Sequence, residues 1–202
     1  MTDHYFSSSA GEYAAEPIRV RLGGSERSLE APRGVFSNDG LDVGTAVLLD
    51  AVPEPPATGN LLDIGCGWGP LTLDLALSSP GATVWAVDVN PLALEATRRN
   101  ARALSLSNVN CVAPEEIPAD VRFDAIWSNP PIRIGKAALH ELLTTWLGRL
   151  TTDGEAWLVV QKHLGADSLL RWLNQQPGLD AERATSKKTF RVLRVTRTDE
   201  HA

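Results

Sequence analysis

Short apolar runs alternate with amphipathic segments along most of the chain. Apolar runs at 61–64, 83–87, 108–112, 124–127 and 156–160 predict buried strands, and segments at 71–77, 91–104, 136–150 and 165–175 predict helices. Strands that alternate with helices of about 10–15 residues are typical of a doubly wound, mostly parallel α/β sheet. The last two apolar runs, 179–185 and 189–196, predict an antiparallel pair that closes the sheet. Ligands of such sheets bind beyond the carboxyl ends of the strands, near the point where the strand order reverses.

A different pattern precedes this alternation. Residues 17–22 and 25–31 predict two short strands around Gly23 and Gly24, which is a hairpin signal. A loop then leads into a predicted helix at 42–51, and the turn-rich stretch PEPPATG at 53–59 marks a boundary. We therefore expect a hairpin and lid segment over residues 1–52, packed as one structural unit on a core domain over residues 53–202.

Composition and charge narrow the class of protein. The 202 residues are 43% hydrophobic and 22% charged, which excludes a wholly disordered chain. No apolar run approaches the roughly 20 residues of a membrane span, and the first residues lack the basic and apolar segments of a signal peptide. Two cysteines make no disulfide framework, so we expect a soluble cytoplasmic protein.

The whole chain has a net charge of −6, but one stretch of it is basic. The stretch 183–197 carries no acidic residue, and its basic residues are Arg183, Lys187, Lys188, Arg191, Arg194 and Arg197. A weaker basic cluster lies between positions 19 and 33. Such a stretch is either a track for phosphates or the solvated face of a strand, and charge alone does not decide between them.

The first candidate site is the glycine-rich stretch Asp63–Pro70, where a predicted strand turns into a helix. Its glycines let the backbone pass close to a ligand, and the following helix offers free N–H groups. Asp88 ends the next predicted strand, where a carboxylate can accept bonds from ribose hydroxyls. The spacing is GxGxG rather than the dinucleotide GxGxxG, and Asp63 would repel a pyrophosphate. The stretch therefore favours a nucleoside cofactor that carries an ammonium or sulfonium, rather than a tight turn without a ligand.

The second candidate site is Ser128–Ile132, directly after a predicted strand. Asn129 offers a carbonyl acceptor, and Pro130 presents its own carbonyl on a stiff backbone. Two adjacent acceptors can hold both hydrogens of an exocyclic NH₂ group and turn its lone pair toward an electrophile. A proline-rich loop that merely ends a strand is the simpler alternative, but the glycine-rich site earlier in the chain favours chemistry.

The sequence resembles a known family in these motifs. DIGCGWG, VDVN and NPPI resemble the class I S-adenosylmethionine-dependent methyltransferases. HYFS at 4–7, GVFS at 34–37, LDVGT at 41–45, NPPIRIGK and KTFRVL at 188–193 resemble the methyltransferase small-domain family, which includes the 16S ribosomal RNA guanine-N2 methyltransferases of the RsmC type. The resemblance implies a Rossmann-like, mostly parallel seven-stranded sheet with a C-terminal antiparallel strand, and a small hairpin before it.

The resemblance also implies roles for individual residues. S-adenosylmethionine would be bound by Asp63, Gly65, Cys66, Gly67, Gly69, Asp88, Asn90 and Glu115, with Phe36 and Ser37 closing over it and with Asp42 and Thr45 supporting that lid. Asn129, Pro130 and Pro131 would hold the target amine of an RNA base. Ile132, Arg133, Lys136 and Lys162 would contact the RNA. No metal is implied, and we expect a monomer.

Two departures from the family pattern affect the substrate. Many relatives place an aromatic residue after NPP to stack on the flipped base, whereas this chain has Ile132, so stacking is weaker or comes from elsewhere. The larger guanine-N2 enzymes carry a second, degenerate copy of the domain, and this sequence contains one copy. A different RNA, or a protein glutamine amide, therefore remains an alternative acceptor.

Other classes fit less well. A nicotinamide oxidoreductase is disfavoured by the glycine spacing and by Asp63. A non-catalytic RNA-binding domain would be expected to lose its glycines or its NPP motif, and this chain keeps both. Cys66 lies between glycines with no histidine nearby in the motif, so we expect a small side chain in a tight turn rather than a nucleophile.

Overall fold

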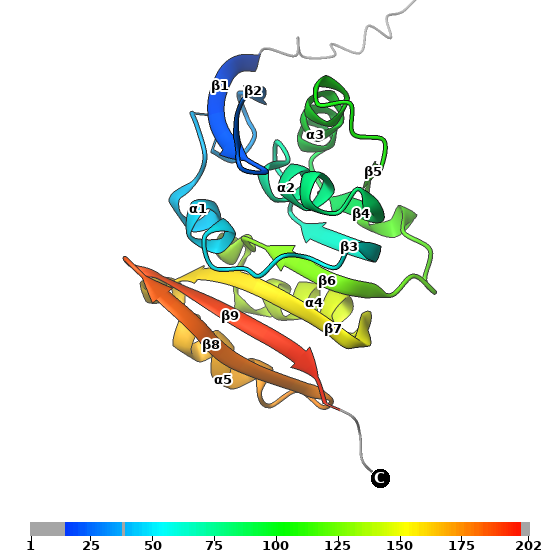
Figure 1. Ribbon diagram of the computed structural model, residues 1–202. Helices are drawn as coiled ribbons and strands as arrows, with labels where there is room; N and C mark the ends of the chain where they lie inside the picture. Colours follow the sequence, from blue (N-terminus) through cyan, green and yellow to red (C-terminus); the bar gives the residue numbers. More distant parts are fainter. Residues whose placement is uncertain (1–14, 38, 199–202) are drawn as a thin grey trace, which may run out of the picture.

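The computed structural model describes residues 15–37 and 39–198, so the HYFS segment at 4–7 lies outside the described residues. A seven-stranded sheet forms the centre of the molecule (Figure 1). Its strands are β3 (Thr58–Ile64), β4 (Gly81–Val87), β5 (Val109–Val112), β6 (Phe123–Ser128), β7 (Leu150–Gln161), β8 (Leu179–Lys187) and β9 (Phe190–Arg197). Their spatial order is β5-β4-β3-β6-β7-β9-β8.

The pairing of the strands confirms the expected fold class. Strands β3 to β7 pair in parallel, whereas β9 lies between β7 and β8 and is antiparallel to both. The order reverses between β3 and β6, and there Ile64 pairs with Ser128, so the two candidate motifs leave the sheet side by side. The predicted strand at 156–160 was too short, because β7 begins at Leu150 and an irregular register opposite Phe123 and Ala125 accommodates its polar first half.

Helices cover both faces of the sheet (Figure 1). One face packs against α1 (Val43–Leu49) and α2 (Pro70–Ser78), with α3 (Pro91–Ala103) beside them, and the other packs against α4 (Lys136–Leu147) and α5 (Ala166–Leu173). Short 3-10 turns, η1 (Pro114–Glu116), η2 (Ile132–Ile134) and η3 (Lys162–Leu164), follow β5, β6 and β7. Leu61, Leu62 and Ile64 of β3 are all buried, as expected of a strand covered on both faces.

The helix starts follow from local chemistry. Asp42 and Asn90 accept bonds from backbone N–H groups in the first turns of α1 and α3. Proline occupies the first position of α2 and α3, where its missing N–H costs nothing. These signals explain why the predicted helix starts agree with the structure to within a residue or so.

The N-terminal strands form the expected hairpin, β1 (Ala15–Leu22) with β2 (Ser25–Pro32), as a separate two-stranded sheet. Its inward side chains pack with residues of α2 and α3. Asn100 of α3 exchanges two 2.8 Å bonds with the backbone of Glu30 and donates a third bond to the carbonyl of Trp68. This side chain joins the hairpin, α3 and the glycine-rich loop.

Two features are absent from the described residues. None of the helices there is long and apolar enough to cross a membrane. No group of three or more histidine, cysteine, aspartate or glutamate side chains is placed to hold a metal ion within residues 15–37 and 39–198.

Candidate active site

A cavity lies at the carboxyl ends of β3 and β6, where the strand order reverses. It is lined by Phe36, Ser37, Asp42, Thr45, Asp63, Gly65, Cys66, Gly67, Trp68, Pro70, Leu71 and Asn129. The cavity therefore brings together the first candidate motif, the second candidate motif and the segment before α1. Gly69, Asp88, Asn90, Glu115, Pro130 and Pro131 are not among its lining residues.

The glycine-rich loop wraps tightly around the end of β3. Gly67 and Gly69 have φ angles of 60° and 97°, which favour glycine, and a Cβ on Gly69 would lie 2.9 Å from the side chain of Thr97. Gly65 and Cys66 donate backbone bonds to the carbonyl of Val87 at the end of β4. The loop is thus fixed against two neighbouring elements, and Gly69 contributes to its packing rather than to the cavity wall.

Asp63 is the buried acidic group of the cavity, with 1% of its surface exposed. Its Oδ2 accepts bonds from the Thr72 N–H at 3.0 Å and the Thr72 hydroxyl at 2.6 Å, whereas Oδ1 has no partner among the described residues. The pKa of Asp63 is raised to about 7, chiefly by burial and also by the nearby Asp88 carboxylate, while the Thr72 bonds lower it. An unpaired buried carboxylate oxygen beside a cavity is an acceptor prepared for a cationic ligand.

Asp88 lies at the end of β4 and links the loop to the start of α3. Its Oδ2 accepts a bond from the Gly67 N–H at 3.1 Å, and its Oδ1 accepts one from the Asn90 N–H at 2.9 Å. Each oxygen keeps acceptor capacity for a further donor. Asn90 caps α3 through its Oδ1 and donates from Nδ2 to the Gly34 carbonyl, so its side chain is committed to the protein.

The segment before α1 closes one side of the cavity. Trp68 is almost fully buried, and its indole N–H donates to the Ser37 carbonyl at 3.1 Å, which ties this segment to the glycine-rich loop. The neighbouring Phe36 lines the cavity although 66% of its surface is exposed. This arrangement suits a side chain that covers a ligand in the cavity.

Asn129 lines the cavity beside the start of α1. Its Nδ2 donates to Asp42 Oδ2 at 2.8 Å and to Thr45 Oγ1 at 3.1 Å. These bonds use the nitrogen end of the amide, and the oxygen end keeps its acceptor capacity. The Pro130 carbonyl accepts a 2.8 Å bond from the Ile132 N–H and retains one lone pair for another donor.

Cys66 and Glu115 are two further predicted cofactor contacts, of which Cys66 is buried and Glu115 is exposed. Burial raises the pKa of the Cys66 thiol well above its usual value, so this buried side chain stays protonated, in keeping with a small residue in a tight turn. Glu115 lies exposed on η1, while its neighbour Glu116 accepts a bond from the Ala113 N–H. A contact of Glu115 with the cofactor stays a prediction.

The predicted RNA-contacting residues lie on or directly after the turn η2 and on the turn η3. Ile132 and Lys136 line a second hollow with Leu139, His140, Val160, Leu164, Gly165, Ser168 and Leu169. Arg133 and Lys162 are exposed on η2 and η3 but do not line it. The Lys162 N–H donates to the Thr189 carbonyl, which holds η3 beside the turn between β8 and β9.

The basic stretch 183–197 is largely paired within the protein. Arg183 bonds to Asp167, Lys187 to Asp50, and Arg194 to both Glu155 and Glu182. Arg197 donates to a backbone carbonyl of β7. For these four residues the solvated strand face describes the surroundings better than a phosphate track.

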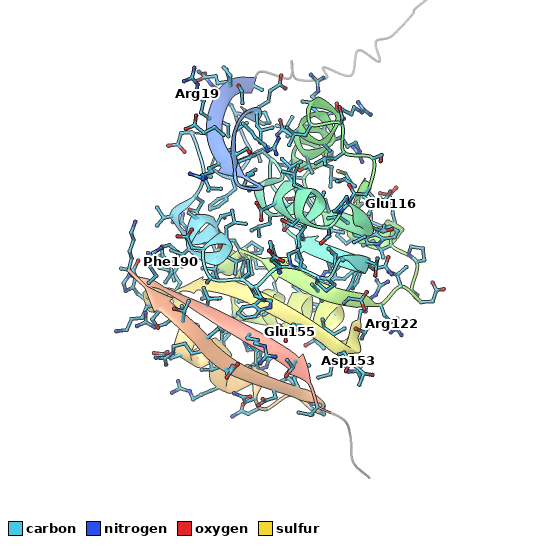
Figure 2. All side chains as sticks on the ribbon, in the orientation of Figure 1. Arg19, Glu116, Arg122, Asp153, Glu155 and Phe190 are labelled. Atoms are coloured by element: carbon cyan, nitrogen blue, oxygen red, sulfur yellow. The ribbon has the colours of Figure 1, made fainter. Side chains whose placement is uncertain are left out.

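Phe190 is a residue of the site region to which the sequence alone assigned no role. It opens β9, beside α1 (Figure 2), and it is only partly buried. A Cβ built on Gly44 would lie 2.9 Å from the Phe190 ring and 3.3 Å from the Asn129 amide nitrogen. The available signal was the aromatic position in KTFRVL together with the missing aromatic after NPP. By contrast, Arg19 of the weaker basic cluster lies on the hairpin, well away from Phe190 (Figure 2).

Comparisons with known proteins agree with this geometry. Residues 26–194 match the methyltransferase small domain family. The chain is 32% identical over 179 residues to YbxB, an uncharacterized protein of Bacillus subtilis strain 168, covering 87% of this chain and 89% of that one. It is 35% identical over 164 residues to ribosomal RNA small subunit methyltransferase C of Escherichia coli O9:H4, covering 76% of this chain and 43% of the relative.

A solved structure shows the same likeness. The Thermus thermophilus 16S rRNA N2 G1207 methyltransferase RsmC, in complex with AdoMet and guanosine, superposes with a TM-score of 0.78 at 25% identity, over 91% of this chain and 51% of that chain. The present chain spans about half the length of the ribosomal RNA methyltransferases it matches. The predictions of family, fold class and S-adenosylmethionine as cofactor are thereby confirmed. The chain belongs to the methyltransferase small domain family of class I S-adenosylmethionine-dependent methyltransferases.

Proposed function

We propose that this chain methylates the exocyclic N2 amine of a guanine in 16S ribosomal RNA, with Asn129 and Pro130 as the groups that hold the amine. The observation that carries the proposal is the position of Asn129 on the wall of the same cavity that Asp63 and the glycine-rich loop line. A cofactor pocket and an amine acceptor thus share one small space at the ends of two neighbouring strands.

The residues of the cavity fit S-adenosylmethionine. The unpartnered Oδ1 of Asp63 suits the ammonium of the methionine part, and the spare acceptor capacity of Asp88 suits ribose hydroxyls. Gly65, Cys66 and Gly67 line the cavity beside Asp63, Asp88 accepts a bond from the Gly67 N–H, and the exposed Phe36 also lines the cavity. When bound, the cofactor supplies a methyl group on a positively charged sulfur, which a nucleophile can accept.

Asn129 and Pro130 act on the nucleophile. The lone pair of a guanine N2 amine is delocalised into the ring, so the free amine is a poor nucleophile. Acceptors at Asn129 Oδ1 and the Pro130 carbonyl, both fixed before the substrate arrives, stabilise the positive charge that develops on the nitrogen. As the new C–N bond forms, the bond between the methyl carbon and the cofactor's sulfur would break, and the nitrogen then loses one proton to solvent water. Therefore no strong general base is required.

Ribosomal RNA as the substrate is supported by the surroundings of the acceptor. Arg133 and Lys136 are exposed shortly after Asn129, and Lys162 is exposed after the neighbouring strand β7. Cations in these positions suit the phosphates beside an unpaired base. The Thermus relative was solved with guanosine, which fits the same class of acceptor. We further propose that the protein is cytoplasmic, because ribosomal RNA is processed in that compartment. We also propose that it is a monomer.

The test is nucleoside mass spectrometry of 16S and 23S ribosomal RNA, digested separately, from cells with and without this gene. We expect the N2-methylguanosine content to fall in 16S but not in 23S ribosomal RNA, to return with the wild-type gene, and not to return with Asn129→Ala. Calorimetric titration with S-adenosylhomocysteine should give similar affinities for wild type and Asn129→Ala. An unchanged nucleoside profile would refute the 16S assignment. Nucleoside analysis of other RNA, or peptide mass spectrometry for methylated glutamine, would then identify the acceptor.

A further inference from the structure

The start of α1 holds the side chain of Asn129 from a distant part of the sequence. Asp42, the residue before the helix, and Thr45, in its first turn, both accept bonds from Asn129 Nδ2, at 2.8 Å and 3.1 Å. An amide nitrogen carries two hydrogens, so these two acceptors use its full donor capacity. From sequence both residues are predicted to support a lid, and in the structure both are bonded to Asn129.

These contacts decide which way the amide faces. The oxygen and nitrogen ends of an asparagine have nearly the same shape, so only its hydrogen-bond partners distinguish its two orientations. A carboxylate accepts bonds and donates none, and in the reversed orientation Asn129 Oδ1 would face Asp42 Oδ2 with no hydrogen between them. The bond to a charged acceptor is also the stronger kind. Asn129 Oδ1 is therefore left facing away from α1.

The two acceptors are themselves fixed. Asp42 Oδ2 also accepts the Thr45 N–H at 3.1 Å as the cap of α1, so the helix start orients the carboxylate. Thr45 is only 3% exposed, which restricts its side chain. At Gly44 an added Cβ would lie 2.9 Å from Asp42 Oδ2 and 3.3 Å from Asn129 Nδ2. The amide packs directly over a helix start that has no room for a larger side chain.

We propose that Asp42 and Thr45 are positioning residues, which fix the Asn129 amide so that Oδ1 is the only end presented to the target amine. This inference rests on the proposed role of Asn129. Without the two acceptors the amide would populate both orientations, and in one of them an N–H would oppose the N–H of the substrate. Turnover would fall while cofactor binding would not.

Thr45 allows a test that separates positioning from packing. Thr45→Val keeps the shape and removes the acceptor oxygen, whereas Thr45→Ser keeps the hydroxyl and removes a buried methyl group. We expect Thr45→Val to lower kcat about tenfold, with the affinity for S-adenosylhomocysteine within twofold of wild type. Thr45→Ser should retain most of kcat even if it is the less stable protein. The opposite ranking, with the valine variant more active than the serine variant, would overturn the proposal.

A double-mutant comparison with Asn129→Ala tests whether Thr45→Val lowers the rate through the Asn129 side chain. Single-turnover rates with radiolabelled cofactor should show that Thr45→Val has no further effect once Asn129 is replaced by alanine. An equal loss in both backgrounds would overturn the positioning role, whereas a wild-type rate for Asn129→Ala would overturn the proposed function itself.

If the rate of Asn129→Ala is too small to measure, hydrogen exchange of the Asn129 side-chain amide, followed in ¹⁵N spectra, tests the positioning role instead. We expect slow hydrogen exchange in wild type and in Thr45→Ser, and faster exchange in Thr45→Val. Identical exchange in all three proteins would contradict the inference.

Discussion

Replacing Asp63 with asparagine is expected to stabilise the fold and to weaken cofactor binding at the same time. In the folded protein the pKa of Asp63 is raised from 3.8 to about 7, first by burial. The folded state therefore binds more protons than the unfolded state between these two values, and the free energy of unfolding falls as pH rises through this window. An asparagine at this position carries no charge at any pH and avoids this loss.

The magnitude follows from the two pKa values. One pKa unit corresponds to about 1.4 kcal/mol, so the full window amounts to about 4 kcal/mol, and the part between pH 6 and pH 8 amounts to about 1 kcal/mol. The difference in unfolding free energy between Asp63→Asn and wild type should grow by that smaller amount over this range. Comparing the two proteins cancels the titration of all other groups.

The assay is urea denaturation without cofactor at pH 6 and pH 8, followed by titration with S-adenosylhomocysteine. The side-chain oxygen of the introduced asparagine can keep both bonds from Thr72, and its NH₂ then occupies the position of the unpartnered Asp63 Oδ1. Loss of a bond to the cofactor's ammonium costs about 1.5–3 kcal/mol, or roughly ten- to a hundredfold in affinity. Asp74→Asn is the matched control, because Asp74 also accepts a backbone N–H bond but does not line the cavity.

Two results would refute this reasoning. A difference in unfolding free energy that stays constant between pH 6 and pH 8 would mean that Asp63 does not titrate within this range in the folded chain. An unchanged affinity in Asp63→Asn, alongside the expected stability change, would show that Asp63 is a structural group that the cofactor does not contact.

Three further predictions concern the loop, the thiol and the surface proposed to contact RNA. Gly69→Ala and Gly24→Ala should each lower the free energy of unfolding by about 1–2 kcal/mol, because alanine is strained in the left-handed backbone conformation. The loss should be larger for Gly69→Ala, because only there does the new Cβ also meet a side chain, that of Thr97. Equal losses in urea denaturation would show that contact with Thr97 adds nothing. The Cys66 thiol, whose pKa burial raises, should react with iodoacetamide at pH 8 only after unfolding, and mass spectrometry of native and urea-treated protein checks this. Lys162→Glu should raise KM for RNA several-fold and make KM less dependent on salt, with kcat unchanged, if Lys162 binds a phosphate. A loss of kcat alone would show that Lys162 does not bind a phosphate.

The sheet and its helices could be predicted well from the sequence because the signals for them are local. Pro91 after Asn90, the hairpin glycines and the alternation of apolar runs all act within one element, and the structure agrees with each of them. Strand β7 was predicted too short because Asp153 and Gly154 interrupt its apolar pattern. Its length depends on a register irregularity with β6, which no local pattern reveals.

Many of the residues predicted for the site line one cavity in the structure, whereas the hydrogen bonds between them could not be predicted from the sequence. The bond between Asp42 and Asn129 joins residues 87 positions apart, so from the sequence only their separate proximity to one end of the sheet could be expected. The partners of Arg183 and Lys187, Asp167 and Asp50, likewise come from outside the basic stretch. Such pairings depend on which elements the fold brings together, and a single sequence does not contain that information in readable form.

The place of β9 in the sheet bears on how the chain acquires its structure during synthesis. The last strand described along the chain is inserted between β7 and β8, which are made before it. Until β9 leaves the ribosome, β7 has an unpaired edge and the apolar faces beneath α4 and α5 are incomplete. An open strand edge is a site of unwanted pairing between chains. The glycine-rich loop and the hairpin can form early, whereas the half of the sheet beyond β6 must wait for the final residues of β9.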